Sequence, residues 1–278
     1  MADSNLRYLI DSYLDWSRSE GIPIVDAFAV DLTTVETAPW PRLGDGVRAA
    51  FVHLKGRGDF VGIQVIDLPP GARTAPLRHL YDEVFYVLSG HGSATIDVGT
   101  GDIGGGKSAS FEWGQRSLFS PPLNQRFQLF NGSGQEPARL VSFNNFPFLM
   151  NLFRNERFLF GNAFRFPDRI GPEKHYSGDG EFLALKPGKH MWETNFVPDL
   201  ATFELPEWDA RGAGSRNIKI ILADSCMHAH TSEMPVGTYK KAHRHGPGAH
   251  VLALTGSGYT LLWNEGDTEY ERHEWKHG

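Results

Sequence analysis

Cysteine is almost missing from this 278-residue sequence, in which Cys226 is the only one. A single cysteine cannot form an intramolecular disulfide, so the small secreted folds that depend on disulfides are excluded. Because free thiols persist in a reducing compartment, we expect a cytoplasmic protein.

Long apolar runs and an excess of basic residues are missing as well. No stretch reaches the roughly 20 apolar residues of a membrane-spanning helix, and the opening MADSNLRYLI lacks the apolar core of a secretory signal. The formal net charge is −6, without a cluster of Lys or Arg. We therefore expect neither a nucleic acid nor a membrane as partner.

The sequence does contain many apolar residues, and they are arranged in short strand-like runs. Hydrophobic residues make up 40% of the chain and aromatic residues 12%, enough for a sizeable core. From about residue 48, runs such as VRAAFVHL, FVGIQVIDL and EVFYVLSG alternate with Gly, Pro and Asp. This texture predicts an all-β sandwich or barrel, and it returns near the C-terminus in NIKIILAD, MHAHTSEM, HVLALTG and GYTLLW.

Changes of texture divide the chain into four segments. An amphipathic pattern capped by Ser4 predicts a helix over residues 4–19. The aromatic and proline-rich stretch NNFPFLMNLFRNERFLFGNAFRFPDR predicts a partly helical connector. The segments are an N-terminal helix and arm (1–47), a first barrel (48–143), the connector (144–212) and a second barrel (213–278).

The second β region repeats the first. GARTAPLRH (71–79) aligns with GTYKKAHRH (237–245), and the alignment continues without a gap from VLSGHG onto ALTGSG, at an offset of 166. Later, Trp113 aligns with Trp275 at an offset of 162. The first repeat therefore carries four additional residues, in the interval that holds GTGDIGGGK.

The stretch GTGDIGGGKSAS (99–110) matches the phosphate-loop pattern G-x-x-x-x-G-K-[ST]. A phosphate loop requires a helix directly after it, because the helix N-terminus faces the phosphates. Here a strand-like sequence follows, and it soon meets Gly114 and Pro121. We predict an elongated hairpin loop and no nucleotide cofactor.

The most informative stretch is GTYKKAHRHGPGAHVLALTGSG (237–258), which resembles the first motif of the cupin superfamily, G-x5-H-x-H-x3,4-E-x6-G. Residues two apart in a strand point to the same face. His243 and His245 are therefore expected to face the barrel interior and to hold one metal ion. Tyr239 and Lys241 share that face; they either line the pocket or form the solvated end of a strand.

The motif departs from the family at its acidic position. The ungapped repeat places Ala249 there, whereas the four-residue spacing places His250 there. With His250, the site resembles the cupin dioxygenases that hold iron with three histidines, such as the gentisate and β-diketone types. With Ala249, His250 points outward and lies beside the site or at the surface. Both alternatives remain open.

The first repeat matches the metal motifs only in part. Leu77 stands where the first His belongs, and Phe127 replaces the His of the second motif. His79 and Glu83 keep the expected spacing. We expect a packed structural barrel in which His79 and Glu83 hydrogen-bond to each other; the weaker alternative is a two-ligand metal site.

The resemblance implies an all-β bicupin of two double-stranded β-helix, or jelly-roll, barrels. The counterpart of Phe127 would fall at position 289, beyond this sequence. We therefore expect a truncated second barrel in a fragment of a longer bicupin. Family members often pair, which implies a homodimer.

Three functions follow from the resemblance. The first is a dioxygenase for a small aromatic or diketone-like substrate, with Fe(II) on His243, His245 and His250. The second is an isomerase or decarboxylase that uses Mn, Ni or Zn as a Lewis acid. The third is a non-catalytic cupin that binds a small molecule.

Overall fold

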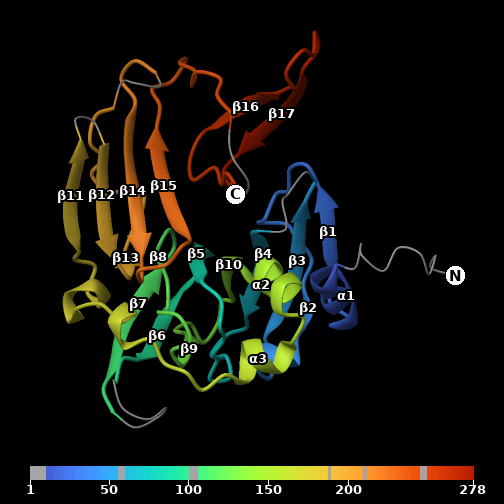
Figure 1. Cartoon of the computed structure of the whole chain (residues 1–278), viewed down its shortest axis with the longest axis vertical. Helices are drawn as coiled ribbons and strands as arrows, with labels where there is room; N and C mark the ends of the chain where they lie inside the picture. The colour runs from blue at the N-terminus through green and yellow to red at the C-terminus, as the bar shows by residue number, and fades with distance from the viewer. Residues whose placement is uncertain (1–10, 56–59, 100–105, 187–188, 209–211, 245–248) are drawn as a thin grey trace, which may run out of the picture.

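A computed structural model describes residues 11–55, 60–99, 106–186, 189–208, 212–244 and 249–278 (Figure 1). The helices and 3-10 turns are α1 (Ser12–Ser19), η2 (Pro41–Leu43), α2 (Phe146–Phe153), α3 (Glu156–Gly161), η3 (Pro167–Arg169) and η4 (Glu173–Tyr176).

Strands form the larger part of the regular structure. Those of the first β region are β1 (Ile24–Ala27), β2 (Ala38–Pro39), β3 (Arg48–Leu54), β4 (Gly62–Leu68), β5 (Glu83–Ser89), β6 (His91–Asp97), β7 (Ser108–Gly114), β8 (Leu118–Phe119), β9 (Phe127–Asn131) and β10 (Ala138–Asn144). Those that follow are β11 (Glu181–Lys186), β12 (Lys189–Thr194), β13 (Phe196–Val197), β14 (Arg216–Leu222), β15 (His228–Glu233), β16 (Ser257–Leu262) and β17 (Glu271–Lys276).

The first β region is a jelly-roll barrel built from two sheets. One sheet has the order β1-β3-β4-β10-β5-β8-β13, with β2 also paired to β3, and the other has the order β7-β6-β9. Aromatic and aliphatic side chains from both sheets meet in one core, among them Phe51, Phe85, Phe111, Phe119, Phe127, Leu129 and Leu140. The all-β jelly roll predicted from the sequence is confirmed here.

Strand β5 is covered on both faces, which explains why its central residues, VFYVL (84–88), are all apolar rather than alternating. Phe85 and Val87 lie in the barrel core, whereas Tyr86 and Leu88 belong to a second apolar cluster on the outer side of the same sheet. A strand that is covered on both faces needs apolar residues at every position.

The N-terminal helix begins later than the sequence pattern predicts. Helix α1 starts at Ser12, and Asp11 caps it by accepting a hydrogen bond from Leu14 N at 2.9 Å. An aspartate at this position satisfies an N–H group that the helix leaves unpaired. The predicted cap, Ser4, lies outside the described residues.

The connector holds more β structure than the sequence predicts. Its first part forms α2, α3, η3 and η4, as expected from the aromatic and proline-rich stretch. Its later part contributes β11, β12 and β13, of which β12 pairs with β14 in parallel. Strand β13 extends the large sheet of the barrel by pairing with β8.

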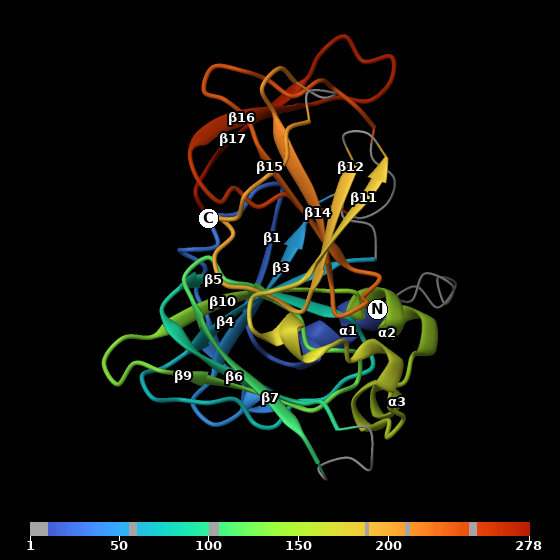
Figure 2. The same ribbon diagram turned by 90° about the vertical axis from the view of Figure 1, so that its left-hand side faces the viewer.

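The second β region is open. A sheet of order β11-β12-β14-β15 and a separate hairpin, β16–β17, lie on the same side of the barrel in both views (Figures 1 and 2). The strand predicted for residues 250–256 is absent, since the structure shows no regular pairing there. Within the described ranges these strands do not close into a second barrel.

No helix in the described part of the chain combines the length and the apolar character needed to cross a membrane.

Candidate functional site

His79 and Glu83 form a buried pair inside the first barrel. His79 Nε2 lies 2.9 Å from Glu83 Oε2, and His79 Nδ1 lies 2.9 Å from the carbonyl oxygen of Tyr81. The Ser142 hydroxyl donates to the other carboxyl oxygen of Glu83. The hydrogen bond between His79 and Glu83 that the sequence predicts is therefore present.

The hydrogen-bond partners fix how many protons this pair holds. Because a carbonyl oxygen only accepts, Nδ1 of His79 must carry a proton and donate it to Tyr81. The bond between Nε2 and the Glu83 carboxyl then contains one further proton, on either atom. The pair is neutral as a whole, which suits its apolar surroundings.

The rings around the pair leave it little access to solvent. The Tyr81 ring stacks on His79 with centroids 3.6 Å apart, and the Phe127 ring meets His79 edge-on at 5.5 Å. Burial, followed by the charge of Glu83, raises the pKa of Tyr81 well above its ordinary value. The Tyr81 phenol therefore stays neutral over the physiological range.

The described residues of the first barrel gather no set of three ligands for a metal ion. Leu77 and Phe127 occupy two of the positions where cupin ligands are expected, and their backbones pair with each other. His79 and Glu83 already satisfy one another. Among the described residues, no three His, Cys, Asp or Glu side chains lie close enough to share an ion. A metal site normally needs at least three protein donors.

The histidine segment of the second repeat lies outside regular structure. Residues 238–244 form no strand, so the alternation expected to turn His243, Tyr239 and Lys241 toward a barrel interior is not established there. All three side chains are exposed, Tyr239 by 80%. His245 lies outside the described residues. The metal and substrate roles of these residues remain predictions.

His243 nevertheless has a defined ring orientation. Its Nδ1 lies 2.9 Å from the carbonyl oxygen of Lys241 and therefore carries the proton. Metal-binding histidines commonly donate their second N–H to a carbonyl in this way, so the chemistry of His243 fits a metal ligand.

His250 lies against the first barrel. Its ring centroid is 6.3 Å from that of Phe143 on β10. Leu252 and Leu254, two and four residues later, also pack against the apolar cluster on the outer side of the barrel. His250 is half-buried, and its role as a metal ligand stays a prediction.

Strand β15 of the open sheet carries polar side chains and precedes the histidine segment along the chain. His228 and His230 on β15 are in register with Ile221 and Lys219 on β14. His230 Nε2 lies 2.7 Å from Asn217 Oδ1. Burial, followed by the charge of Lys219, lowers the pKa of His228.

The glycine-rich stretch joins two antiparallel strands. β6 pairs with β7 from His91–Gly114 to Asp97–Ser108, so a strand follows the loop. The predicted hairpin is confirmed at its described ends, while residues 100–105 lie outside the described part. Lys107 pairs with Glu173 at 2.5 Å.

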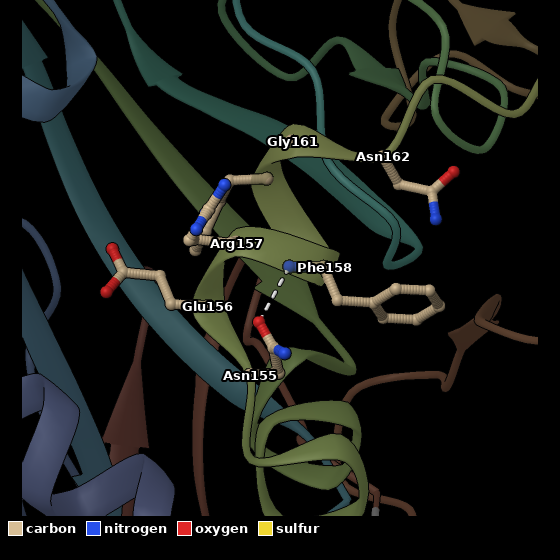
Figure 3. Close-up of a pocket in the computed structure, with 7 residues that line it drawn as sticks. Asn155, Glu156, Arg157, Phe158, Gly161 and Asn162 are labelled. Atoms are coloured by element: carbon tan, nitrogen blue, oxygen red, sulfur yellow. Dashed lines mark hydrogen bonds between the residues drawn. The ribbon is translucent and has the colours of Figure 1, made fainter.

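A shallow hollow surrounds α3 (Figure 3). Its lining comes from one short segment, residues 155–162, in which Asn155 Oδ1 accepts a hydrogen bond from Phe158 N at 3.0 Å. Glu156 contacts Arg42 at 2.6 Å. These contacts start the helix and attach it to the barrel, and they gather no catalytic set of side chains.

Residues 47–160 match the family model described as auxin binding protein. The match covers the first barrel and reaches α3, but it does not extend to the second β region. The barrel itself is an all-β jelly roll of two sheets. A comparison with curated protein sequences finds no match.

Several solved structures are similar to part of the chain. The cupin domain of Cnp3 from Schizosaccharomyces pombe is 16% identical with a TM-score of 0.33, over 42% of this chain and 68% of that one. A mutant of Bacillus subtilis oxalate decarboxylase is 19% identical with a TM-score of 0.32, over 42% of this chain and 28% of that one. Vicilin from Corylus avellana is 14% identical with a TM-score of 0.33, over 42% and 32%. The chain thus matches less than a third of the decarboxylase and of vicilin.

Proposed function

We propose that this protein is a metal-dependent cupin oxidoreductase of the dioxygenase type, acting on a small aromatic or diketone-like molecule. His243 and His245 hold Fe(II), and His250 is the third imidazole ligand. Bound iron supplies the redox and Lewis-acid chemistry of such a reaction. The polar face that carries His228 and His230 is the surface offered to the substrate.

The ring orientation of His243 carries this proposal. Its Nδ1–H donates to the Lys241 carbonyl, the hydrogen bond that orients the ring of many metal-binding histidines. The first barrel supports the assignment by elimination, because Leu77 and Phe127 leave His79 and Glu83 as an isolated pair. The histidine segment is therefore the better candidate for a metal centre.

The test is the metal content of the chain after anaerobic purification, measured by mass spectrometry of the elements. We expect about one iron per chain in the wild type and a loss of most of it in His243→Ala and His245→Ala. His91→Ala, at an exposed position on β6, is the matched control and should keep its metal. Equal metal in all four proteins, or none in the wild type, contradicts the proposal.

Oxygen uptake then separates oxidative from other metal chemistry. An iron-loaded chain should consume oxygen with gentisate or acetylacetone, two probes for the aromatic and diketone classes. Zinc, nickel or manganese at the same histidines, without oxygen uptake, would instead favour an isomerase or decarboxylase.

A second candidate is a cupin that binds a small molecule without turning it over, and it is favoured because no three metal-binding side chains lie close together among the described residues. Aromatic rings and the His79–Glu83 pair fill the first barrel, so such a ligand would bind elsewhere on the chain. In that case His243→Ala would leave the affinity for metal unchanged and would affect only stability.

A further inference from the structure

Two arginines lie opposite each other on the outside of the first barrel. Leu77 and Phe127 exchange both backbone hydrogen bonds, at 2.8 and 2.9 Å, and both contact the core. In an antiparallel pair the next residues along, here Arg78 and Arg126, are close neighbours that point to the other side. Arg78 is half-buried and Arg126 is exposed.

The charge of this pair is not balanced locally. Across the described ranges, neither guanidinium has an ion pair or a hydrogen bond to a side chain. Burial lowers the pKa of Arg78, and the charges of Arg126 and Arg165 lower it further. Like charges placed directly opposite each other destabilise a pair of strands, so an anion between them would be stabilising.

An acid that neighbours Arg126 already pairs with a third arginine, Arg165. Asp97 is the next residue beyond the β6–β9 ladder toward Arg126, whose carbonyl accepts from Asp97 N at 2.8 Å. Its carboxylate pairs with Arg165 at 3.2 Å. The ion pair of Asp97 is thus with Arg165, and among the described residues neither Arg78 nor Arg126 has an ion pair.

Gln125 adds a buried donor beside Arg165, the third arginine. It is 2% exposed, and its Oε1 accepts from Arg165 Nη2 at 2.5 Å. Its Nε2 has no acceptor among the described residues. Buried amide groups are normally satisfied, so an N–H donor left without an acceptor beside Arg165, whose charge reaches Arg78, indicates a missing acceptor.

We propose that Arg78, Arg126 and Gln125 form a binding site for an oxyanion, the phosphate or carboxylate group of a small ligand. Guanidinium groups bind both through paired charge-assisted hydrogen bonds. The site lies on the outer side of the barrel wall, behind His79 and Phe127. It does not depend on the histidine segment or on a metal ion.

The test is calorimetric titration of the whole chain with inorganic phosphate and, separately, with acetate. We expect saturable phosphate binding that weakens at least tenfold in Arg78→Gln and in Arg126→Gln. Arg18→Gln, which removes an exposed arginine from α1, is the control and should bind as the wild type does. Phosphate alone identifies a phosphorylated ligand, and binding of both anions extends the site to carboxylates.

Urea unfolding without added anion gives an independent readout. Removing either arginine relieves repulsion, so both variants should be at least as stable as the wild type. No saturable binding of either anion, or binding that survives the double substitution, would overturn the proposal. A marked loss of stability in the single variants would also overturn it, because it would show that the arginines are structural.

Discussion

Glu83 is hydrogen-bonded to His79 through one carboxyl oxygen and to Ser142 through the other. Both partners are buried, so removing the carboxyl leaves two polar groups without a hydrogen bond. We expect Glu83→Ala to lower the free energy of unfolding by about 3 kcal/mol, within the range for breaking a buried pair. Urea denaturation measures this loss.

Glu83→Gln is the matched variant. Its amide nitrogen can donate to the His79 ring and its amide oxygen can accept from Ser142, so we expect a loss of only about 1 kcal/mol. An equal loss in the two variants would contradict the hydrogen-bond account and would leave packing as the cause.

The sequence predicts only part of this network. His79 and Glu83 are four residues apart, and the family spacing draws attention to both. Ser142 lies 59 residues further along and meets Glu83 only because β10 pairs with β5. Such a contact depends on the register of two distant strands, which no local pattern specifies.

At the scale of the strand, the repeat is confirmed by register. Gly92 pairs with Trp113 across β6 and β7, and Gly258 pairs with Trp275 across β16 and β17. These are the residues that the two offsets align. The hairpin β16–β17 is therefore the counterpart of β6–β7, although it stands apart from the open sheet.

Gly92 is required because the Trp113 ring and the neighbouring strand approach its backbone. A Cβ atom there would lie 1.9 Å from Phe130 O and 2.4 Å from Trp113 Cζ2. We expect Gly92→Ala to destabilise the chain by at least about 2 kcal/mol, because the ladder must shift to admit the methyl group.

The control for this change is Gly114→Ala, on the strand that pairs with β6. A Cβ atom at Gly114 would meet nothing within 4 Å. The urea concentration at which half of the protein is unfolded should therefore be clearly lower for Gly92→Ala than for Gly114→Ala. If Gly114→Ala costs as much as Gly92→Ala, flexibility rather than crowding determines the effect.

The strand predicted over residues 250–256 does not form, and the cause is the lack of a partner strand among the described residues. In the first repeat, β5 is held between β10 and β8, and its backbone groups are paired on both sides. Among the described residues, the corresponding segment has no neighbouring strand to pair with. Its apolar residues pack against the barrel, as Leu252 and Leu254 do, without forming a ladder.

At the scale of the molecule, the open sheet is attached through a shared apolar core. Val65 and Val141, on the outer side of the barrel sheet, are in the same cluster as Ile218 and Ile220 of β14. A salt bridge between Arg169 and Asp82 at 2.7 Å also joins the connector to the barrel. Unfolding the open sheet would expose the outer face of the barrel to water.

This shared core predicts that the two β regions unfold together. Ile220 is fully buried, so we expect Ile220→Ala to lower stability by about 2–4 kcal/mol. Hydrogen exchange in increasing urea, followed on peptides from β6 and β14, should show the same shift of midpoint in both. Leu262→Ala, at an exposed position on β16, is the control and should shift neither. A shift confined to β14 would mean that the barrel is stable without the open sheet, and that the shared apolar cluster contributes little to its folding.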